Sequence, residues 1–304
     1  MISRLTLFVV QFLFLCIVNA SSAAPDIHHE AFDATNNTVM ANIDNAAKHT
    51  ESPLPEDYKI VSLAPHLTEW VYSLGLDKHL VAVSDYSDFP KEATLLPRVA
   101  DYQGADIASI VALQPNLVLA WDGGNKPQDM NKLVALGLNV FKSRITTIDD
   151  IPTEITRLAN LTHTQSKAKE LTAHFSTTLD ELRIRYKSTA PTSVFYYSWT
   201  APLMSIGSDA WANQLLKVCG AQTTFIDSPV DYPQVSVKDV LIRQPKVLVA
   251  ASKSSKDELE IFWHPHREHL SAPLIVVNPD VTSRFSLRII NELKVLCKGI
   301  NENA

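Results

Sequence analysis

From residue 58 onward, the chain alternates between short apolar runs and longer stretches in which apolar residues recur at helical spacing. The apolar runs are rich in Val, Ile and Leu, and they predict strands at 58–64, 79–85, 116–121 and 138–143. Helical patterns lie between these runs, at 67–75, 106–113 and 127–137. Strands that alternate with helices indicate parallel βαβ units, and continuous apolar runs indicate strands buried on both faces. Residues 57–145 are therefore expected to form one α/β lobe.

Two helical stretches follow, and the second is long. The first covers residues 146–161, and the second, 166–187, contains no Gly or Pro. Apolar residues of the second stretch, from Ala168 to Tyr186, fall on one face at helical spacing. A helix of this length measures ~33 Å. We therefore expect residues 146–190 to be a helical connector whose long helix bridges two lobes.

The alternation of strands and helices resumes in the last third of the chain. Strands are predicted at 193–197, 246–251 and 274–277, and helices at 209–218, 236–243, 256–263 and 285–300. Ser236 followed by Asp239 resembles a capping box at one of these helix starts. Residues 191–304 are expected to form a second α/β lobe. The predicted fold class is α/β, with two lobes built on central parallel sheets and joined by a single long helix.

The beginning of the chain has the composition of a segment that is removed on export. Arg4 precedes an apolar run, and small residues suited to cleavage follow in "NASSAAP". We expect residues 1–24 to be a signal peptide, with Cys16 in the discarded leader. The run is shorter than the ~20 apolar residues of a membrane span, and a retained anchor is the alternative. Residues 25–56 are polar and aperiodic, so we expect a disordered linker there.

Composition argues against several classes of protein. The formal net charge is −6 and no basic stripe is present, whereas nucleic-acid binding needs clustered Lys and Arg. The sequence contains no nucleophile elbow, Walker loop, dinucleotide fingerprint or zinc-protease helix motif. Among enzymes, the alternative is a hydrolase on an α/β scaffold, and the sequence shows no nucleophile–base pair that would support it. His264, His266 and His269 fit no standard zinc spacing, and we expect a solvated helix end rather than a metal site.

Two cysteines remain once the leader is set aside, Cys219 and Cys297. An even number of cysteines in an exported chain favours a disulfide. The alternative is two separate buried thiols.

Aromatic residues recur where the predicted strands end. The members of this group are Tyr86, Tyr102, Trp121, Tyr197, Trp199 and Tyr232. Ligands of open parallel sheets bind outside the carboxyl ends of the strands, so these side chains would face a common cleft. Pro65 and His66 also follow a strand, and Asp280 and Arg284 follow the last one. Aromatic faces supply contact area, and Gly123 lets the backbone approach a bulky ligand. The alternatives are that the aromatics belong to the core and that His66 serves the helix start.

Several stretches together resemble one known family. They are "VSLAPHLTEWVYSLG", "AVSDYSDFP", "YQGADIASIVALQPNLVLAWDGGN", "NQLLKVCGA", "YPQVS" and "LCKGI". In this order they resemble the periplasmic vitamin B12-binding proteins of bacterial cobalamin ABC importers, from about residue 58 to residue 300. "SDYSDFP", "AWDGGN" and "YPQVS" are specific to that branch. The strand–helix alternation is shared with siderophore and haem binders of the same class.

The resemblance implies two Rossmann-like lobes around a rigid connecting helix, the class III arrangement, with cobalamin between the lobes. By motif position, the implied ligand contacts are Tyr86, Tyr102, Trp121, Tyr232, Asp280 and Arg284, with Pro65, His66, Gly123 and Trp199 as further candidates. Tyr102 and Tyr232 stand where the family can have tryptophan. The family's disulfide matches Cys219 and Cys297. No cofactor other than the transported ligand is implied.

The resemblance also implies a monomer in the periplasm that docks on an inner-membrane ABC permease with its ATPase. The family uses a surface glutamate on each lobe for docking, and the matching positions here hold Ala108 and Lys238. Asp106 and Asp239 lie close by and are the expected substitutes. A siderophore- or haem-binding protein of the same class is the alternative function.

Overall fold

The computed structural model describes residues 53–303 of the chain. The signal peptide predicted at 1–24, including its cysteine, and most of the linker predicted at 25–56 lie outside the described residues. Leu54 packs against the buried core, so the folded region includes residues before the predicted start at 57.

A six-stranded sheet forms the centre of the first lobe. Its order is β4-β3-β2-β1-β5-β6, with β1 Ile60–Ser62, β2 Leu80–Ser84, β3 Arg98–Asp101, β4 Gly104–Ala105, β5 Leu117–Trp121 and β6 Val140–Ser143. All neighbouring pairs are parallel except β3 and β4. The accompanying helices are α2 Pro65–Ser73, α3 Ile107–Leu113 and α4 Pro127–Ala135, with short 3₁₀ turns η1 Asp77–His79 and η2 Lys91–Leu95. The sequence missed β3 and β4, because neither strand contains more than two consecutive apolar residues.

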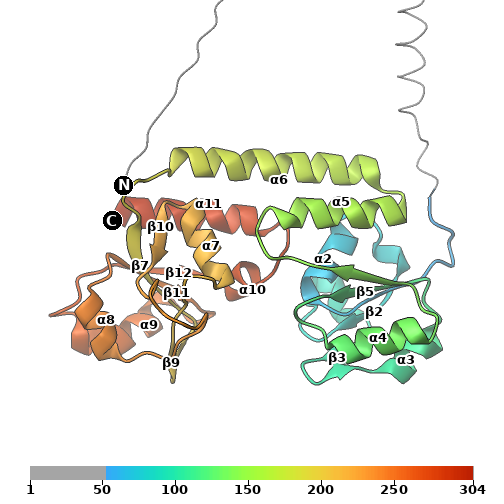
Figure 1. Ribbon diagram of the computed structural model, residues 1–304, viewed down its shortest axis with the longest axis horizontal. Coiled ribbons are helices and arrows are strands. Elements are labelled where there is room, and N and C mark those ends of the chain that lie inside the picture. The colour runs from blue at the N-terminus through green and yellow to red at the C-terminus, as the bar shows by residue number, and fades with distance from the viewer. Residues whose placement is uncertain (1–52, 304) are drawn as a thin grey trace, which may run out of the picture. The chain divides into compact units, whose positions relative to one another are not determined.

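Two helices make up the connector, α5 Asp150–Thr162 and α6 Gln165–Arg185. α5 starts later than the predicted residue 146, because Asp150 Oδ2 accepts hydrogen bonds from the Thr146 and Thr147 amides at 2.8 and 2.7 Å. α6 packs against α5 and against two helices of the second lobe, α7 and α11 (Figure 1). The long helix therefore follows the first lobe along the chain and contacts helices of the second lobe.

The second lobe contains a four-stranded parallel sheet in the order β10-β7-β11-β12. Its strands are β7 Thr192–Tyr197, β10 Ala221–Thr223, β11 Val247–Ala251 and β12 Leu274–Val277, and β8 Trp199–Thr200 pairs with β9 Leu203–Met204 as a separate hairpin. The helices are α7 Trp211–Val218, α8 Val237–Arg243, α9 Lys256–Trp263, α10 Pro279–Thr282 and α11 Ile289–Asn303, with η3 His264–His266.

One prediction for this lobe needs correction. The last helix begins at Ile289 rather than at 285, because the preceding residues leave the lobe surface to contact the first lobe. The helix predicted at 256–263 ends at Trp263, and the 3₁₀ turn His264–His266 follows it. The described residues contain no group of His, Cys, Asp or Glu side chains suited to a metal ion.

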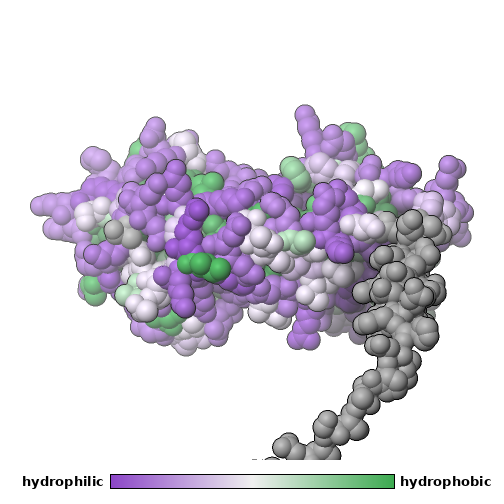
Figure 2. Space-filling view, turned by 90° about the horizontal axis from the view of Figure 1, so that it is seen from above, coloured by the Kyte–Doolittle hydropathy of each residue, from purple (hydrophilic) through white to green (hydrophobic). Residues whose placement is uncertain are grey.

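The two lobes share a continuous apolar core. One cluster of buried residues runs from Leu67 and Trp70 in α2 through the connector to Phe285 and Ile289. The face that carries α6 is mostly hydrophilic with scattered apolar residues, which is ordinary for a protein surface (Figure 2). Between residues 53 and 303, none of the helices has the length and apolar content needed to span a bilayer.

One segment recurs in both lobes. α3 and α8 each end at a glutamine in the left-handed conformation, Gln114 with φ 50° and Gln244 with φ 46°. A proline and then a buried strand, β5 or β11, follow each glutamine. The two strand ends, at Trp121 and Ala251, therefore stand at equivalent places in the two sheets.

Candidate ligand-binding site

Each sheet has one position where neighbouring strands lead into connections on opposite sides. This position lies between β1 and β5 in the first sheet and between β7 and β11 in the second. Open α/β sheets bind ligands at such positions. In the first lobe the residues there are Pro65, His66 and Trp121, and in the second lobe they are Trp199 and Lys253.

The loop after β5 explains why Trp121 precedes two glycines and an asparagine. Asn125 Oδ1 accepts a hydrogen bond from the Trp121 amide at 2.7 Å, and Asn125 Nδ2 donates to the Leu63 carbonyl at 2.8 Å. The indole ring lies against Gly124, where a Cβ atom would come within 1.8 Å of Trp121 Cε3. Gly123 has a φ of +124°, which L side chains rarely adopt. The glycines therefore allow the ring to fold back over its own loop.

His66 is buried and packs edge-on against Trp121. Its ring makes edge contacts with Trp70, Trp121 and Phe285, at centroid distances of 5.2, 5.5 and 5.2 Å. Burial, with a smaller contribution from the charge of Arg284, lowers the pKa of His66 from 6.5 to about 3. The imidazole is therefore neutral at ordinary pH, and its Nε2 atom has no hydrogen-bond partner within residues 53–303.

One segment of the second lobe, residues 282–288, contacts the first lobe. Trp70 Nε1 of α2 donates to the Phe285 carbonyl at 2.9 Å, although 215 positions separate the two residues. The Phe285 ring packs edge-on against Trp121 at 5.3 Å and Trp211 at 4.6 Å. Trp211 Nε1 in turn donates to the Thr282 carbonyl at 2.9 Å. The segment is thus held by indole groups of both lobes.

Ion pairs of the same segment reinforce this contact. Arg284 Nη1 donates to Asp88 Oδ1 at 2.7 Å and to Glu69 Oε1 at 3.2 Å. Arg288 donates to both oxygens of Glu69, and its guanidinium lies 3.7 Å from the centre of the Phe89 ring. Glu69 is only 3% exposed and Arg284 only 8%. We call Glu69, Trp70, Arg284, Phe285 and Arg288 the interlobe joint.

The resemblance implies that Arg284 contacts the ligand, and this contact stays a prediction. In this structure its guanidinium pairs with Glu69 and Asp88 of the first lobe. Burial opposes its charge, but the hydrogen bonds of Asp88 and Glu69 outweigh burial and raise the pKa of Arg284. Burial by itself raises the pKa of Asp88, but the hydrogen bond and charge of Arg284 outweigh burial and lower it. Asp280, also predicted at the site, pairs with Lys253 at 2.7 Å.

Four of the predicted ligand contacts are exposed aromatic side chains. This exposed aromatic group consists of Tyr86, Tyr102, Trp199 and Tyr232, which are between 59% and 84% exposed. Tyr86 has a φ of 60°, an uncommon conformation for a residue other than glycine, and such conformations concentrate at functional sites. Within residues 53–303, the group makes no ring–ring contact. Tyr197 differs, because it is buried against Phe195 and accepts a hydrogen bond from Trp263 at 3.0 Å.

The two carboxylates expected to dock lie at equivalent helix starts. Asp106 Oδ2 accepts a hydrogen bond from Ser109 Oγ at 2.6 Å, and Asp239 Oδ2 accepts one from Ser236 Oγ at 2.6 Å. In α3 the aspartate precedes the serine, and in α8 the order is reversed. These serine hydrogen bonds lower the pKa of both carboxyl groups. Each lobe therefore presents one exposed, charged carboxylate at the same place.

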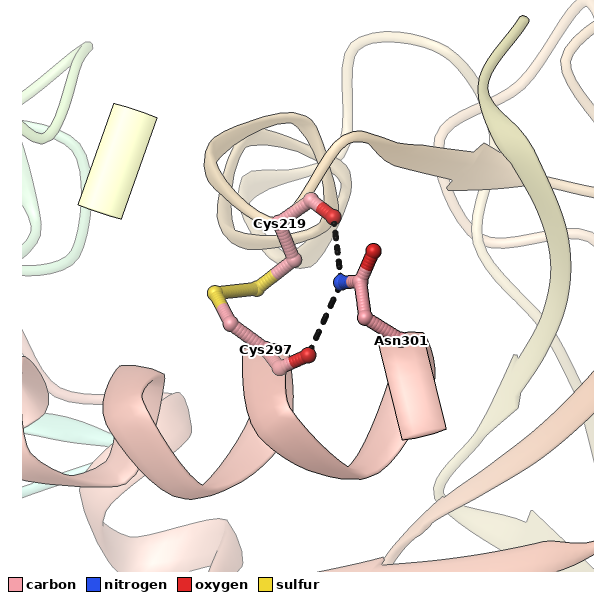
Figure 3. The surroundings of a disulfide bond; sticks show 3 residues. All are labelled: Cys219, Cys297 and Asn301. Carbon is pink, nitrogen blue, oxygen red and sulfur yellow. Dashed lines mark hydrogen bonds between the residues drawn. A yellow bond between two sulfur atoms is a disulfide. The ribbon is translucent and has the colours of Figure 1, made fainter. Parts of the chain in front are cut away.

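The predicted disulfide joins Cys219, at the end of α7, to Cys297 in α11. Asn301 Nδ2 donates to the carbonyl groups of both cysteines, at 3.0 and 2.9 Å (Figure 3). The bond joins residues 78 positions apart and ties α11 to α7 within the second lobe.

Sequence reasoning missed Glu69, Asp88, Phe285 and Lys253. Glu69 had a signal in the sequence, because it stands next to Trp70 on the buried face of a helical pattern. A buried carboxylate there indicates a cationic partner elsewhere in the chain. Lys253 also had a signal. The recurring Gln-Pro segments align β5 with β11. In this alignment Lys253, two residues after β11, is equivalent to Gly123, two residues after β5.

Comparisons with known proteins agree with this architecture. Residues 60–265 match the model of a family described as periplasmic binding protein. The chain is 35% identical over 246 residues to a vitamin B12-binding protein of Photorhabdus laumondii, which covers 81% of this chain and 88% of that protein.

Two solved structures from Vibrio cholerae are also similar. The periplasmic vitamin B12-binding protein is 33% identical with a TM-score of 0.73, and the match covers 81% of this chain and 97% of that one. The periplasmic haem-binding protein is 19% identical with a TM-score of 0.68, covering 80% and 98%. At that identity, the second likeness shows a common fold alone.

Proposed function

This chain belongs to the periplasmic binding protein family, and we propose that it captures a corrinoid of the vitamin B12 type between its lobes. In this proposal the protein binds and releases its ligand without chemical change, acts in the periplasm after export, and delivers the ligand to an ABC importer.

The observation that carries the proposal is the exposed aromatic group at the strand ends of both lobes. Large aromatic side chains exposed in this way mark an interaction surface when several stand around one site. A corrin ring is broad and largely apolar on its faces, so it suits stacked or edge-on aromatic contacts. The identity to vitamin B12-binding relatives supports this ligand over others.

The residues divide into two roles within this proposal. Trp121 and the exposed aromatic group contact the corrinoid, together with Asp280. His66 supports the Trp121 ring from below, and Arg284 fixes the segment that carries Phe285. Pro65 begins α2 and Gly123 shapes the Trp121 loop, so both act through the backbone.

Calorimetric titration of the exported protein with cyanocobalamin tests the proposal. We expect saturable one-to-one binding and a pink protein after gel filtration. A protein that binds no corrinoid but acquires a Soret band on addition of haem would overturn the ligand assignment and favour the haem alternative.

For docking, we propose that Asp106 and Asp239 provide the negative charge that meets cationic residues of the permease. They are placed alike on the two lobes, although Ala108 and Lys238 occupy the positions where the family carries glutamate. The double variant Asp106→Asn/Asp239→Asn should keep corrinoid binding and lose co-purification with the permease. Unchanged co-purification would contradict this role.

A further inference from the structure

The ion pair between Lys253 and Asp280 stands apart from the rest of the charged network. Lys253 Nζ lies 2.7 Å from Asp280 Oδ2, and its side chain is 69% exposed, whereas Glu69 and Arg284 are almost completely buried. Exposed ion pairs contribute little to stability, so this pair is free to rearrange around a ligand.

The position of Lys253 places it at the ligand site of the second lobe. It follows β11 at the point where the strand connections diverge, opposite Trp199 after β7. Asp280 also lies 3.8 Å from Arg284, which reaches Asp88 of the first lobe. The pair therefore lies where the two lobes meet.

The network around the pair is electrically balanced. Lys253, Arg284 and Arg288 face Glu69, Asp88 and Asp280, three cations against three carboxylates. The hydrogen bond with Asp280 raises the pKa of Lys253, so the ammonium stays charged. Such a site has no surplus charge with which to attract an anionic ligand, and the Asp280 carboxylate repels one.

An exposed donor, Lys253, next to a partly exposed acceptor, Asp280, complements a neutral group that both donates and accepts hydrogen bonds. A primary carboxamide fits, because its oxygen accepts from the ammonium while its N–H donates to the carboxylate. We propose that Lys253 is a ligand-binding residue and that, together with Asp280, it recognises a carboxamide on the edge of the ligand. This inference rests on the proposed function, since corrinoids of the vitamin B12 type carry such amides around the ring.

The test uses the exported full protein and calorimetry with cyanocobalamin. Lys253→Met should weaken binding about tenfold, because a hydrogen bond to a charged group is lost. Lys253→Arg keeps a cationic donor and should stay within about threefold of wild type. Lys256→Met removes an exposed lysine three positions away, at the start of α9, and should leave the affinity unchanged.

A second set of ligands tests recognition of the amide itself. In this panel each peripheral carboxamide of cyanocobalamin is in turn hydrolysed to a carboxylate. Wild type should bind one of these carboxylate derivatives about tenfold more weakly than cyanocobalamin. Asp280→Asn should bind that derivative more tightly than wild type does, because the repelling charge of Asp280 is gone. The same derivative should bind Lys253→Met still more weakly.

The outcomes separate this inference from the proposed function. If wild type binds no corrinoid, the proposed function fails and the inference fails with it. If wild type binds cyanocobalamin but Lys253→Met binds it equally well, only the role of Lys253 is overturned. If every carboxylate of the panel binds wild type and the variants alike, recognition of an amide is overturned.

Discussion

The exposed aromatic group comes from strand ends and the loops after them, whereas the interlobe joint comes from helix α2 and the segment before α11. Their physical situations are opposite. The aromatic side chains stand in solvent without ring contacts among the described residues, whereas the joint is buried and its charges are paired across the lobes. The exposed aromatic group and the joint lie close together at one point. Asp88 follows Tyr86 by two residues, and it accepts a hydrogen bond from Arg284 of the joint.

This difference teaches which predicted contacts are available to a ligand. Buried charges need their partners, because an unpaired charge in the interior is strongly unfavourable. The charge of Arg284 is therefore paired across the two lobes, while Tyr86 and the rest of the exposed aromatic group have accessible surface that a ligand can contact. Substitutions in the joint should change stability first, and substitutions in the aromatic group should change binding alone.

The largest effect is expected from Glu69→Ala in the joint. Removing this carboxylate leaves Arg288 without its ion-pair partner and Arg284 with fewer, so the free energy of unfolding should fall by ~3–5 kcal/mol. Urea denaturation measures this change. Glu170→Ala, which removes an exposed ion pair with Lys167, is the control and should change stability by less than ~0.5 kcal/mol. Equal stability of the two variants would show that the joint does not hold the lobes.

His66 should make stability depend on pH. The unfolded chain binds a proton near pH 6.5 that the folded protein does not bind until about pH 3. The contribution of His66 is therefore complete above pH 6.5 and is lost as the pH falls toward 3, by up to about 1.4 kcal/mol per pH unit.

Denaturation curves between pH 3 and 6.5 test this dependence. His66→Phe should flatten the slope, since the ring remains apolar and cannot be protonated. His174→Gln removes an exposed histidine of α6 and should keep the wild-type slope. A wild-type slope in His66→Phe would contradict the buried neutral imidazole.

Trp121 is in neither group but shares a feature with each, because its ring packs against Phe285 of the joint and its side chain is partly exposed. Trp121→Ala should weaken cyanocobalamin binding by ~1–3 kcal/mol. Gly124→Ala should weaken it also, because the added methyl group would occupy the place of the indole ring. Calorimetry measures both, and Leu95→Ala, an exposed apolar residue of η2, is the unchanged control. Wild-type affinity in Trp121→Ala would remove this residue from the site.

The smallest effect on stability is expected in the exposed aromatic group. Tyr102→Ala should leave the free energy of unfolding within ~0.5 kcal/mol of wild type and lower the affinity for cyanocobalamin by about 1 kcal/mol. Ile184→Ala, at an equally exposed position of α6, should change neither quantity. A loss of stability without a loss of affinity would place Tyr102 in the fold rather than in the site.

The order of strands and helices was readable from the sequence wherever periodicity was strong. β5, β11 and β12 are continuous apolar runs, and α6 lacks any helix breaker, so their existence and type were predictable. β3, β4, β10 and the hairpin of β8 and β9 were not, because none of these strands contains more than two consecutive apolar residues. The start of α11 was wrong because residues 285–288 continue the helical pattern of the sequence but belong to the segment that contacts the first lobe.

The sequence by itself determined the two α/β lobes, the long helix between them and the aromatic residues at the strand ends, because these follow from local spacing and residue type. The tertiary structure decided which of those residues are exposed and which are committed to pairing. His66 packs edge-on against Trp121, and Arg284 pairs with Glu69 and Asp88. Lys253 follows β11, at the position between β7 and β11 where the strand connections diverge. Each of these depends on contacts between positions far apart in the chain, and local periodicity contains no information about such contacts.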